Sequence, residues 1–295
     1  MAASSSPMAI VVSCFQWQNI TWLLRRLKFY MLINSFVCAV TAAVVVLQAT
    51  FGSHHHVLVG MYVGALVRIA CMIGWFEWIS TFKAKIYGNK RIRLTPPQQL
   101  AILCHIALVV VPTEMTTLVV GTSSAIDTSI TYKSFLEEYA YFLPKSLVLE
   151  LVFDFVHYAV HYTCHQIPVL YKHVHKQHHM HLHPSPLSTY EESAIDLFLT
   201  NVVPMAIAFA VGPALSSHQL QLVLAYKTYV EVAGHSGLDI KGMSFPQMPL
   251  VQCLSICIRV HDHDLHHTHP AFNFAKRFSV WDRLFGTFKP ASSVS

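Results

Sequence analysis

Long apolar stretches alternate with short polar segments over most of the chain. The longest stretches each hold about the 20 apolar residues that a helix needs to cross a bilayer. They predict three helical pairs: 30–51 with 57–77, 98–120 with 140–160, and the shorter 196–212 with 218–234. The length of the third pair fits a full crossing and also a shallow dip into the membrane.

The composition agrees with a membrane protein. Of the 295 residues, 54% are hydrophobic and only 12% are charged, which is too apolar for an ordinary soluble domain. The seven cysteines lie mostly in apolar stretches, where cysteine packs as a small hydrophobic residue, so we expect no disulfide framework. We expect an all-α, polytopic membrane protein with four or more transmembrane helices, and no nucleic-acid partner.

Lysine and arginine orient the predicted helices. Arg25, Arg26 and Lys28 precede the first apolar stretch and the basic segment 83–93 follows the second, whereas the connection between them has neither residue type. Cytosolic loops carry such an excess of positive charge. Both ends of the first hairpin are therefore expected in the cytosol, and alternation puts the segment after residue 160 on the same side.

Histidine is the unusual residue of this chain. Of its 20 histidines, nine fall between residues 157 and 183, five between 261 and 269, and one is His235. These clusters flank the third apolar pair, which can return the chain to the side that it left. We therefore expect the clusters to form one site, in a helical cap on the cytosolic side.

A polar stripe runs along the predicted helix at 140–160. His157, His161 and His165 recur every four residues, and Glu150 and Asp154 lie on the same face. Ionisable groups at membrane depth are costly unless they are paired, hydrated or bound to a metal. The stripe is therefore a candidate functional site.

Two further motifs read histidine, two residues, then two histidines. Positions i, i+3 and i+4 of a helix point in a similar direction, so each motif is expected to offer three nitrogens to a metal ion. The motifs are His175, His178 and His179, and His263, His266 and His267.

The two motifs and the first pair of histidines give about eight nitrogen donors, which is more than one first-row ion uses. Two metal ions are therefore expected. Either His157 or His165 can partner His161. Imidazole suits zinc, copper, iron and nickel alike, so these residues do not select the element.

At these residues the chain resembles the fatty acid hydroxylase and sterol desaturase superfamily, whose signature is three histidine boxes on a helical membrane core. The resemblance covers about residues 146 to 289. It rests on Asp154 and Tyr158 before the box His161 to His165, Leu170-Tyr171-Lys172 before the box His175 to His179, the isolated His235-Ser236-Gly237, the box His263 to His267, Asn273, and the stretch Trp281 to Thr287.

The resemblance implies two iron ions that use dioxygen, as co-substrate, to oxidise a carbon–hydrogen bond of a lipid or sterol. It also implies an external reductant, NAD(P)H acting through an electron-transfer protein such as cytochrome b5, and a membrane such as the endoplasmic reticulum with the active site facing the cytosol. It favours His165 over His157. The expected ligands are His161, His165, His175, His178, His179, His235, His263, His266 and His267.

Other residues are expected near this site without a fixed role. As further ligands, or as groups that orient ligands, we consider His157, Asp154, Tyr158, Glu231, His261 and Asn273. His173, His181, His183 and His269 are surplus to the boxes, and His105 is expected to be structural. Arg68 and Glu114, inside predicted spans, are expected to pair with each other.

The chain departs from the family pattern at Tyr162, Phe274 and Ala275, which leaves the subfamily open. Sterol, sphingoid base, fatty acyl chain and squalene all remain compatible substrates, and hydroxylation, desaturation and epoxidation remain compatible reactions. The expected organisation is an N-terminal cytosolic segment (1–29), transmembrane hairpins (30–145), a catalytic domain (146–289) and a short tail (290–295).

Two other classes of function are less well matched. A zinc-dependent membrane hydrolase would want a His-Glu-x-x-His helix, which the sequence lacks. A metal transporter would place histidines and carboxylates on several spans along a pathway, whereas most histidines here are expected at one membrane face.

Overall fold

The computed structural model describes residues 17–51, 56–83, 86, 92–124, 133–239, 247, 248, 251, 254 and 256–291. Within these residues every named element is a helix, and extended pairing is limited to isolated bridge residues such as Cys257 and Phe278, which pair with each other. The predicted all-α architecture is confirmed. His54 and His55 and most of the tail 290–295 lie outside the described residues.

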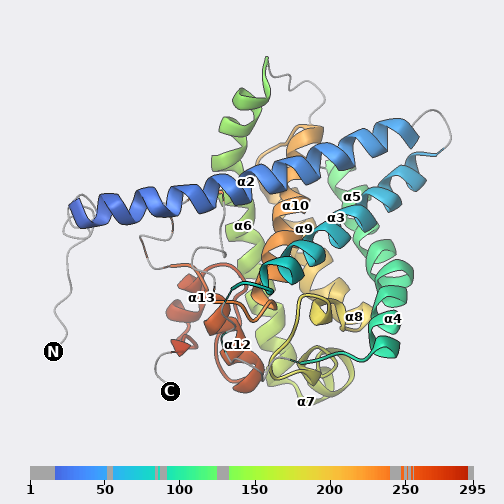
Figure 1. Ribbon diagram of the computed structural model, residues 1–295. Helices are drawn as coiled ribbons and strands as arrows, with labels where there is room; N and C mark the ends of the chain where they lie inside the picture. Colours follow the sequence, from blue (N-terminus) through green and yellow to red (C-terminus); the bar gives the residue numbers. More distant parts are fainter. Residues whose placement is uncertain are drawn as a thin grey trace.

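The first predicted hairpin is confirmed as helices α2 (Trp17–Phe51) and α3 (Val57–Ile79), which pack against each other (Figure 1). Two glycines of α3 allow this approach. A Cβ atom at Gly64 would lie 3.0 Å from Val44 Cγ1, and one at Gly60 would lie 3.3 Å from the backbone of Gln48. Small residues at such contacts let membrane helices pack closely.

Four helical stretches of the described chain are long and apolar enough to cross a membrane: Leu27–Phe51, Val57–Ile79, Pro96–Val119 and Ala194–Val211. The chain is a multi-pass membrane protein. The stretches expected at 140–160 and 218–234 are helical, in α6 (Phe135–Gln166) and α10 (Ser217–Gly234), but they are not among the four. Buried charged residues such as Glu150 and Lys227 explain the difference, because they lower the hydropathy of helices that pack inside the protein.

The second and third predicted pairs do not pack as simple hairpins. The third apolar stretch is one helical run of α4 (Pro96–His105), η2 (Ile106–Val110) and α5 (Val111–Ser124). Helix α6 packs mainly against α9 (Val203–Val211), which also contacts α5, while α10 packs mainly against α2 and α3. The wrong pairing arises because apolar length predicts that a helix is buried but does not select its neighbour.

A proline opens a π-helical turn close to the histidines. Segment η6 (Phe198–Val202) joins α8 (Ala194–Leu197) to α9, where Pro204 has no backbone N–H to donate to the carbonyl of Thr200. That carbonyl accepts a hydrogen bond from Nδ1 of His157 at 2.7 Å instead. The irregular turn therefore gives a buried histidine a fixed partner.

Buried charges join the membrane helices to the C-terminal half. The predicted pair of Arg68 and Glu114 is confirmed, with Nη2 and Oε2 2.6 Å apart. Lys227 of α10 lies 3.3 Å from Glu114 and 3.1 Å from Glu231, and Lys276 lies 3.0 Å from Glu231. We call these five residues the charge ladder.

The segment after helix α12 (Val260–Thr268) is anchored to α6. Both carboxylate oxygens of Asp154 accept backbone N–H groups, from residues 276, 277 and 278, at 2.7 to 2.8 Å. The Nε of Arg277 donates to Glu150 at 2.6 Å. Asp154 therefore holds the backbone of the segment after α12, and its expected role as a ligand or a ligand-orienting group stays a prediction.

Candidate metal centre

Nine histidines converge in two adjacent groups, and these are the nine expected as ligands. In each group, one nitrogen or other ligand atom per residue lies within 4.8 Å of the others. The first histidine group is His161, His165, His175, His179 and His266; the second histidine group is His178, His235, His263 and His267. Residues from α6, α10, α12 and the segment between α7 (Pro168–Leu170) and η4 (His178–Met180) thus meet in one place.

The two double-histidine motifs do not serve one group each, as the spacing suggested. His175 and His179 lie in the first group but His178 lies in the second, and the third box is divided in the opposite way. For the third box, which lies in α12, a helical step of about 100° per residue explains the division, because positions i and i+4 nearly align whereas i+3 and i+4 diverge. The second box is not the regular helix that its spacing predicted: it runs from the π-helical segment η3 (Tyr171–His175) through a turn into η4. Each motif therefore links the two groups.

Backbone carbonyls and a carboxylate fix the orientation of four of the nine rings through Nδ1. His161 donates to the carbonyl of Phe274 (2.7 Å), His266 to that of Phe272 (2.6 Å), and His235 to that of Glu231 (2.8 Å). His175 donates to the carboxylate of Asp196 (2.9 Å). Each of these neutral rings then presents Nε2 as a lone pair.

These lone pairs face one another, which tests whether the residues fit a metal. The Nε2 atoms of His161 and His175 are 2.9 Å apart, and neither has a proton to share once Nδ1 carries it. Nitrogens bound about 2.1 Å from a common ion lie about 3.0 to 3.4 Å apart. The other Nε2 separations agree: 3.3 Å for His161–His165 and 3.1 Å for His175–His179 in the first group, and 3.4 Å for His178–His235 and 3.1 Å for His235–His263 in the second. The donor set fits two metal ions.

Burial keeps the rings neutral and available as ligands. It lowers the pKa of His178, His263 and His267 well below the ordinary value of 6.5, that of His235 to about 4 and that of His266 to about 3. Neighbouring imidazoles lower the pKa of the other four rings further, whereas for His235 the nearby charge of Lys276 does so. A buried cluster of neutral imidazoles is the form that binds a transition metal.

His157 lies outside both groups. Its Nδ1 is held by the Thr200 carbonyl, and its ring packs 5.2 Å from that of His161. His165 lies in the first group, as the resemblance favoured.

The remaining candidates surround the groups without joining them. Tyr158 Oη lies 3.1 Å from the hydroxyl of Thr287, and Asn273 donates to the carbonyls of Asp262 and Lys289. The backbone of Asn273 has φ of 60°, a left-handed conformation that asparagine tolerates. His261 lies 3.4 Å from Asp239. Glu231 contacts the second group through its carbonyl, while its carboxylate belongs to the charge ladder.

The surplus histidines have other partners. His181 lies 2.6 Å from Glu191 and His183 lies 2.9 Å from Asp264. His173 is exposed, and the ring of His269 lies 3.0 Å from the hydroxyl of Thr268. These residues contribute to the surroundings of the centre.

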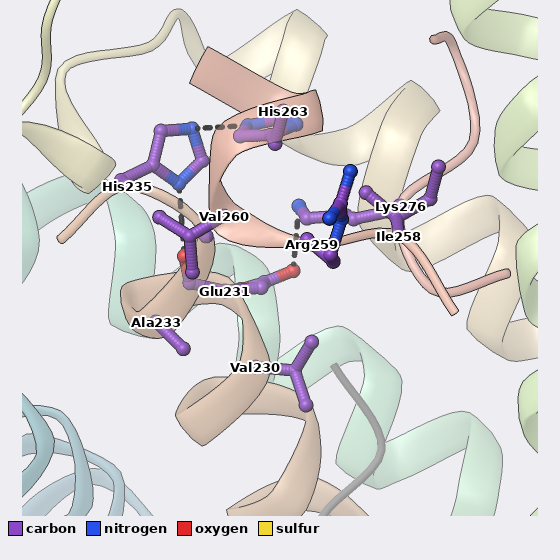
Figure 2. Close-up of a pocket in the computed structure, with 10 residues that line it drawn as sticks. Val230, Glu231, Ala233, His235, Ile258, Arg259, Val260, His263 and Lys276 are labelled. Carbon is purple, nitrogen blue, oxygen red and sulfur yellow. Dashed lines mark hydrogen bonds and ion pairs between the residues drawn. The ribbon is translucent and has the colours of Figure 1, made fainter. Parts of the chain in front are cut away.

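A small pocket adjoins the second histidine group (Figure 2). Glu231 and Lys276 face each other across one side of it, and His235 and His263 lie at another side. Apolar side chains complete the wall: Val230, Ala233, Ile258 and Val260. The pocket therefore brings an apolar surface and a buried ion pair next to two of the nine histidines.

Sequence reasoning missed the groups that orient the rings. Asp196 and Lys276 were not singled out, although a carboxylate at the start of the apolar stretch 196–212 was a visible signal. The carbonyls of Phe272 and Phe274 carry no sequence signal, because every residue has one. Their role depends on how the segment after α12 folds.

Comparison with known proteins agrees with this site. A family model described as fatty acid hydroxylase matches residues 146–287. Fatty acid hydroxylase vlmA of Lecanicillium sp is 33% identical over 168 residues, which are 54% of this chain and 45% of that protein. Human cholesterol 25-hydroxylase is 30% identical over 48% of this chain and 50% of its own length. Sphinganine C4-monooxygenase 1 of Arabidopsis thaliana is 28% identical over 48% of this chain and 53% of its own length.

No solved structure matches the chain. The chain spans about half the length of the curated relatives that it matches. The matched residues include both double-histidine motifs, His235 and the Asp154 anchor. Residues 146–287 therefore resemble the fatty acid hydroxylase superfamily, as the histidine boxes indicated.

Proposed function

We propose that this protein is a di-iron, dioxygen-dependent membrane oxidoreductase that oxidises a carbon–hydrogen bond of a lipid or sterol. The observation that carries the proposal is the pair of adjacent histidine groups, five and four residues strong, with Nε2 lone pairs facing each other at 2.9 to 3.4 Å. Named relatives that act on a fatty acid, a sterol and a sphingoid base support the substrate class.

The first group would hold one iron ion and the second group the other. When bound, the two ions supply the activation of dioxygen and the oxidation of the substrate. The chain's own residues hold the ions, and the Nδ1 anchors keep the rings from turning. Burial of the nitrogens, with His266 fully enclosed and His161 only 3% exposed, limits water at the reacting atoms.

The pocket beside His235 and His263 is where we expect the reacting part of the substrate. Its apolar side chains suit a hydrocarbon, and α10, which supplies part of its wall, packs on the candidate spans of α2 and α3, which suits entry from the bilayer. The substrate itself, and the choice among hydroxylation, desaturation and epoxidation, depends on how a longer molecule fits this wall.

Electrons have to come from another protein, because the sequence contains no flavin, nicotinamide or haem motif. We propose cytochrome b5 or a similar donor, supplied by NAD(P)H. Lys172 and Lys176 are exposed on the turn that carries the second box, whereas nearby Asp196 and Asp264 are buried. An exposed basic surface suits an acidic donor. We place the enzyme in the endoplasmic reticulum with this face in the cytosol.

The test is metal analysis and oxygen uptake on protein purified in detergent, together with lipid and sterol profiles of cells with and without the protein. We expect two iron ions per chain, reductant-dependent oxygen uptake, and one lipid or sterol class that changes with the protein. Residues 146–289 are expected to provide the site.

Two results would contradict the proposal. Tight zinc without oxygen uptake would favour a hydrolase, and metal translocation in vesicles would favour a transporter. Full turnover without any transition metal would end the proposal.

A further inference from the structure

Glu192 is a buried carboxylate close to the second histidine group, and neither the expected ligand set nor the ring anchors include it. It is 6% exposed, and an oxygen of its carboxylate lies within 4.8 Å of a ring nitrogen of His178 and of a carboxylate oxygen of Asp196. No hydrogen bond or ion pair joins this carboxylate to the described part of the chain. A buried carboxylate without a partner is costly.

The local fold holds Glu192 in this place. The next residue, Ser193, caps α8 by accepting the backbone N–H of Asp196 at 3.1 Å. The same hydroxyl donates to the carbonyl of Val174 at 2.9 Å. Ser193 thereby fastens the start of α8 to the segment that carries the second box.

The nearby cations are already engaged. Lys276 binds Glu231 at 3.0 Å, and Lys227 lies between Glu114 and Glu231. Burial and the adjacent Asp196 raise the pKa of Glu192 well above its ordinary value despite these two lysines. The lysines of the charge ladder therefore do not serve as direct partners of the Glu192 carboxylate.

His178 lacks the corresponding partner. Its Nε2 faces Nε2 of His235 at 3.4 Å, which leaves Nδ1 for a second contact, and no hydrogen bond to Nδ1 is formed within the described residues. The ring of His178 stacks on that of His175, 5.2 Å away at 29°. His175 has a carboxylate partner in Asp196, so the two stacked rings differ only in that His178 still needs one.

We propose that Glu192 is a positioning residue for the second metal ion: with that ion bound, its carboxylate would accept Nδ1–H of His178, as Asp196 accepts that of His175. The inference rests on the proposed di-iron function. With this contact, each ion has one histidine whose Nδ1–H is accepted by a carboxylate. Both carboxylates come from the five residues 192–196. Carboxylates that back a metal-bound histidine fix its tautomer and raise its basicity.

The test uses the full-length protein in detergent, loaded with ferrous iron or cobalt(II). Metal per chain is followed during timed exposure to a chelator, with the cobalt absorption spectrum as a second readout. For Glu192→Ala we expect one ion to be retained as in the wild type and the other to bind about 10- to 100-fold more weakly. Glu192→Gln keeps an oxygen that can accept Nδ1–H, so we expect only a fraction of this loss.

Two matched variants set the scale. Glu191→Ala removes the adjacent carboxylate, which pairs with His181 outside both groups, and should leave both ions unchanged. Asp196→Ala should weaken the other ion, through His175. These comparisons separate a selective effect from general unfolding, which would release both ions together.

The inference is overturned if Glu192→Ala keeps both ions at wild-type rates. It is also overturned if Glu192→Gln loses the second ion as fully as Glu192→Ala, because the carboxylate would then be a direct ligand. Neither result touches the proposed function. A wild-type protein that retains no transition metal would instead remove the proposed function, and this inference with it.

Discussion

The two histidine groups differ in how they are held and in what surrounds them. The first has five members, two of them half-buried, and lies under the turn that carries the exposed Lys172 and Lys176. The second has four members, one of them half-buried, and borders the pocket with Glu231 and Lys276. The first group therefore lies beside exposed lysines, and the second lies beside the pocket that we propose for the substrate.

Their anchors come from different parts of the chain. The first group depends on the carbonyls of Phe272 and Phe274 and on Asp196, while the second depends on the end of α10 through Glu231. A substitution that disturbs one set of anchors should therefore affect one ion first. The predictions below use this difference.

Loss of a ligand should have the largest effect. His178→Ala leaves three histidines in the second group, and His266→Ala leaves four in the first. We expect turnover to be abolished in both, because each variant disturbs one ion of the pair, and we expect His178→Ala to lose its ion more completely. Metal content and oxygen uptake measure this, with membrane insertion as the control. Full activity in either variant would remove these residues from the ligand set.

Asp154→Ala should come next, through stability. It leaves three buried backbone N–H groups without their acceptor, which costs about 3 to 5 kcal/mol. The freed residues 276–278 follow Phe274, whose carbonyl anchors His161 and whose N–H stays bound to Asp282, so the first ion should weaken before the second. Thermal unfolding and chelator release measure the two effects. Equal loss of both ions would contradict the separate anchoring of the groups.

Acidification should remove the second ion before the first. The folded pKa is about 4 for His235 and about 3 for His266, both below the ordinary 6.5. For such groups the contribution to stability is complete above pH 6.5 and is lost as the pH falls toward the folded value. We expect the metal-free protein to lose thermal stability across this window. In the loaded protein, metal release followed against pH should begin with the ion of the second group, and the reverse order would contradict the comparison.

Charge reversal on the surface should have the smallest effect. Lys172→Glu with Lys176→Glu should change the free energy of unfolding by no more than about 0.5 kcal/mol, because both side chains are exposed. Reduction by an acidic donor protein should nevertheless slow, most clearly at low salt. Stopped-flow reduction measures the rate, and a small chemical reductant serves as the control. An unchanged rate with the acidic donor would place its docking surface elsewhere.

Sequence patterns predicted the helices and the nine converging histidines because periodicity and apolar length are properties of short stretches of chain. The four-residue spacing of His161 and His165 fixes their common face in any helix. The division of His266 from His267 also follows from the 100° step of helix α12, whereas that of His178 from His179 depends on the irregular chain between η3 and η4.

Such patterns do not predict which helices pack together or which groups anchor the histidine rings. That α9, and not α5, packs on α6 depends on the shapes of whole helices. That Phe274 offers its carbonyl to His161 depends on Asp154 holding the backbone two residues further on. Glu192 belongs to no motif in the sequence, and its burial is evident only from the fold.

The charge ladder has a consequence for biosynthesis. Arg68 enters the bilayer with α3 and meets Glu114 only after 46 more residues, while Lys227 and Lys276 arrive much later. Each charged group left without its partner in lipid is costly. A chain that ends between Arg68 and Glu114 leaves this arginine without its partner in the bilayer, so cellular surveillance should eliminate such incomplete copies.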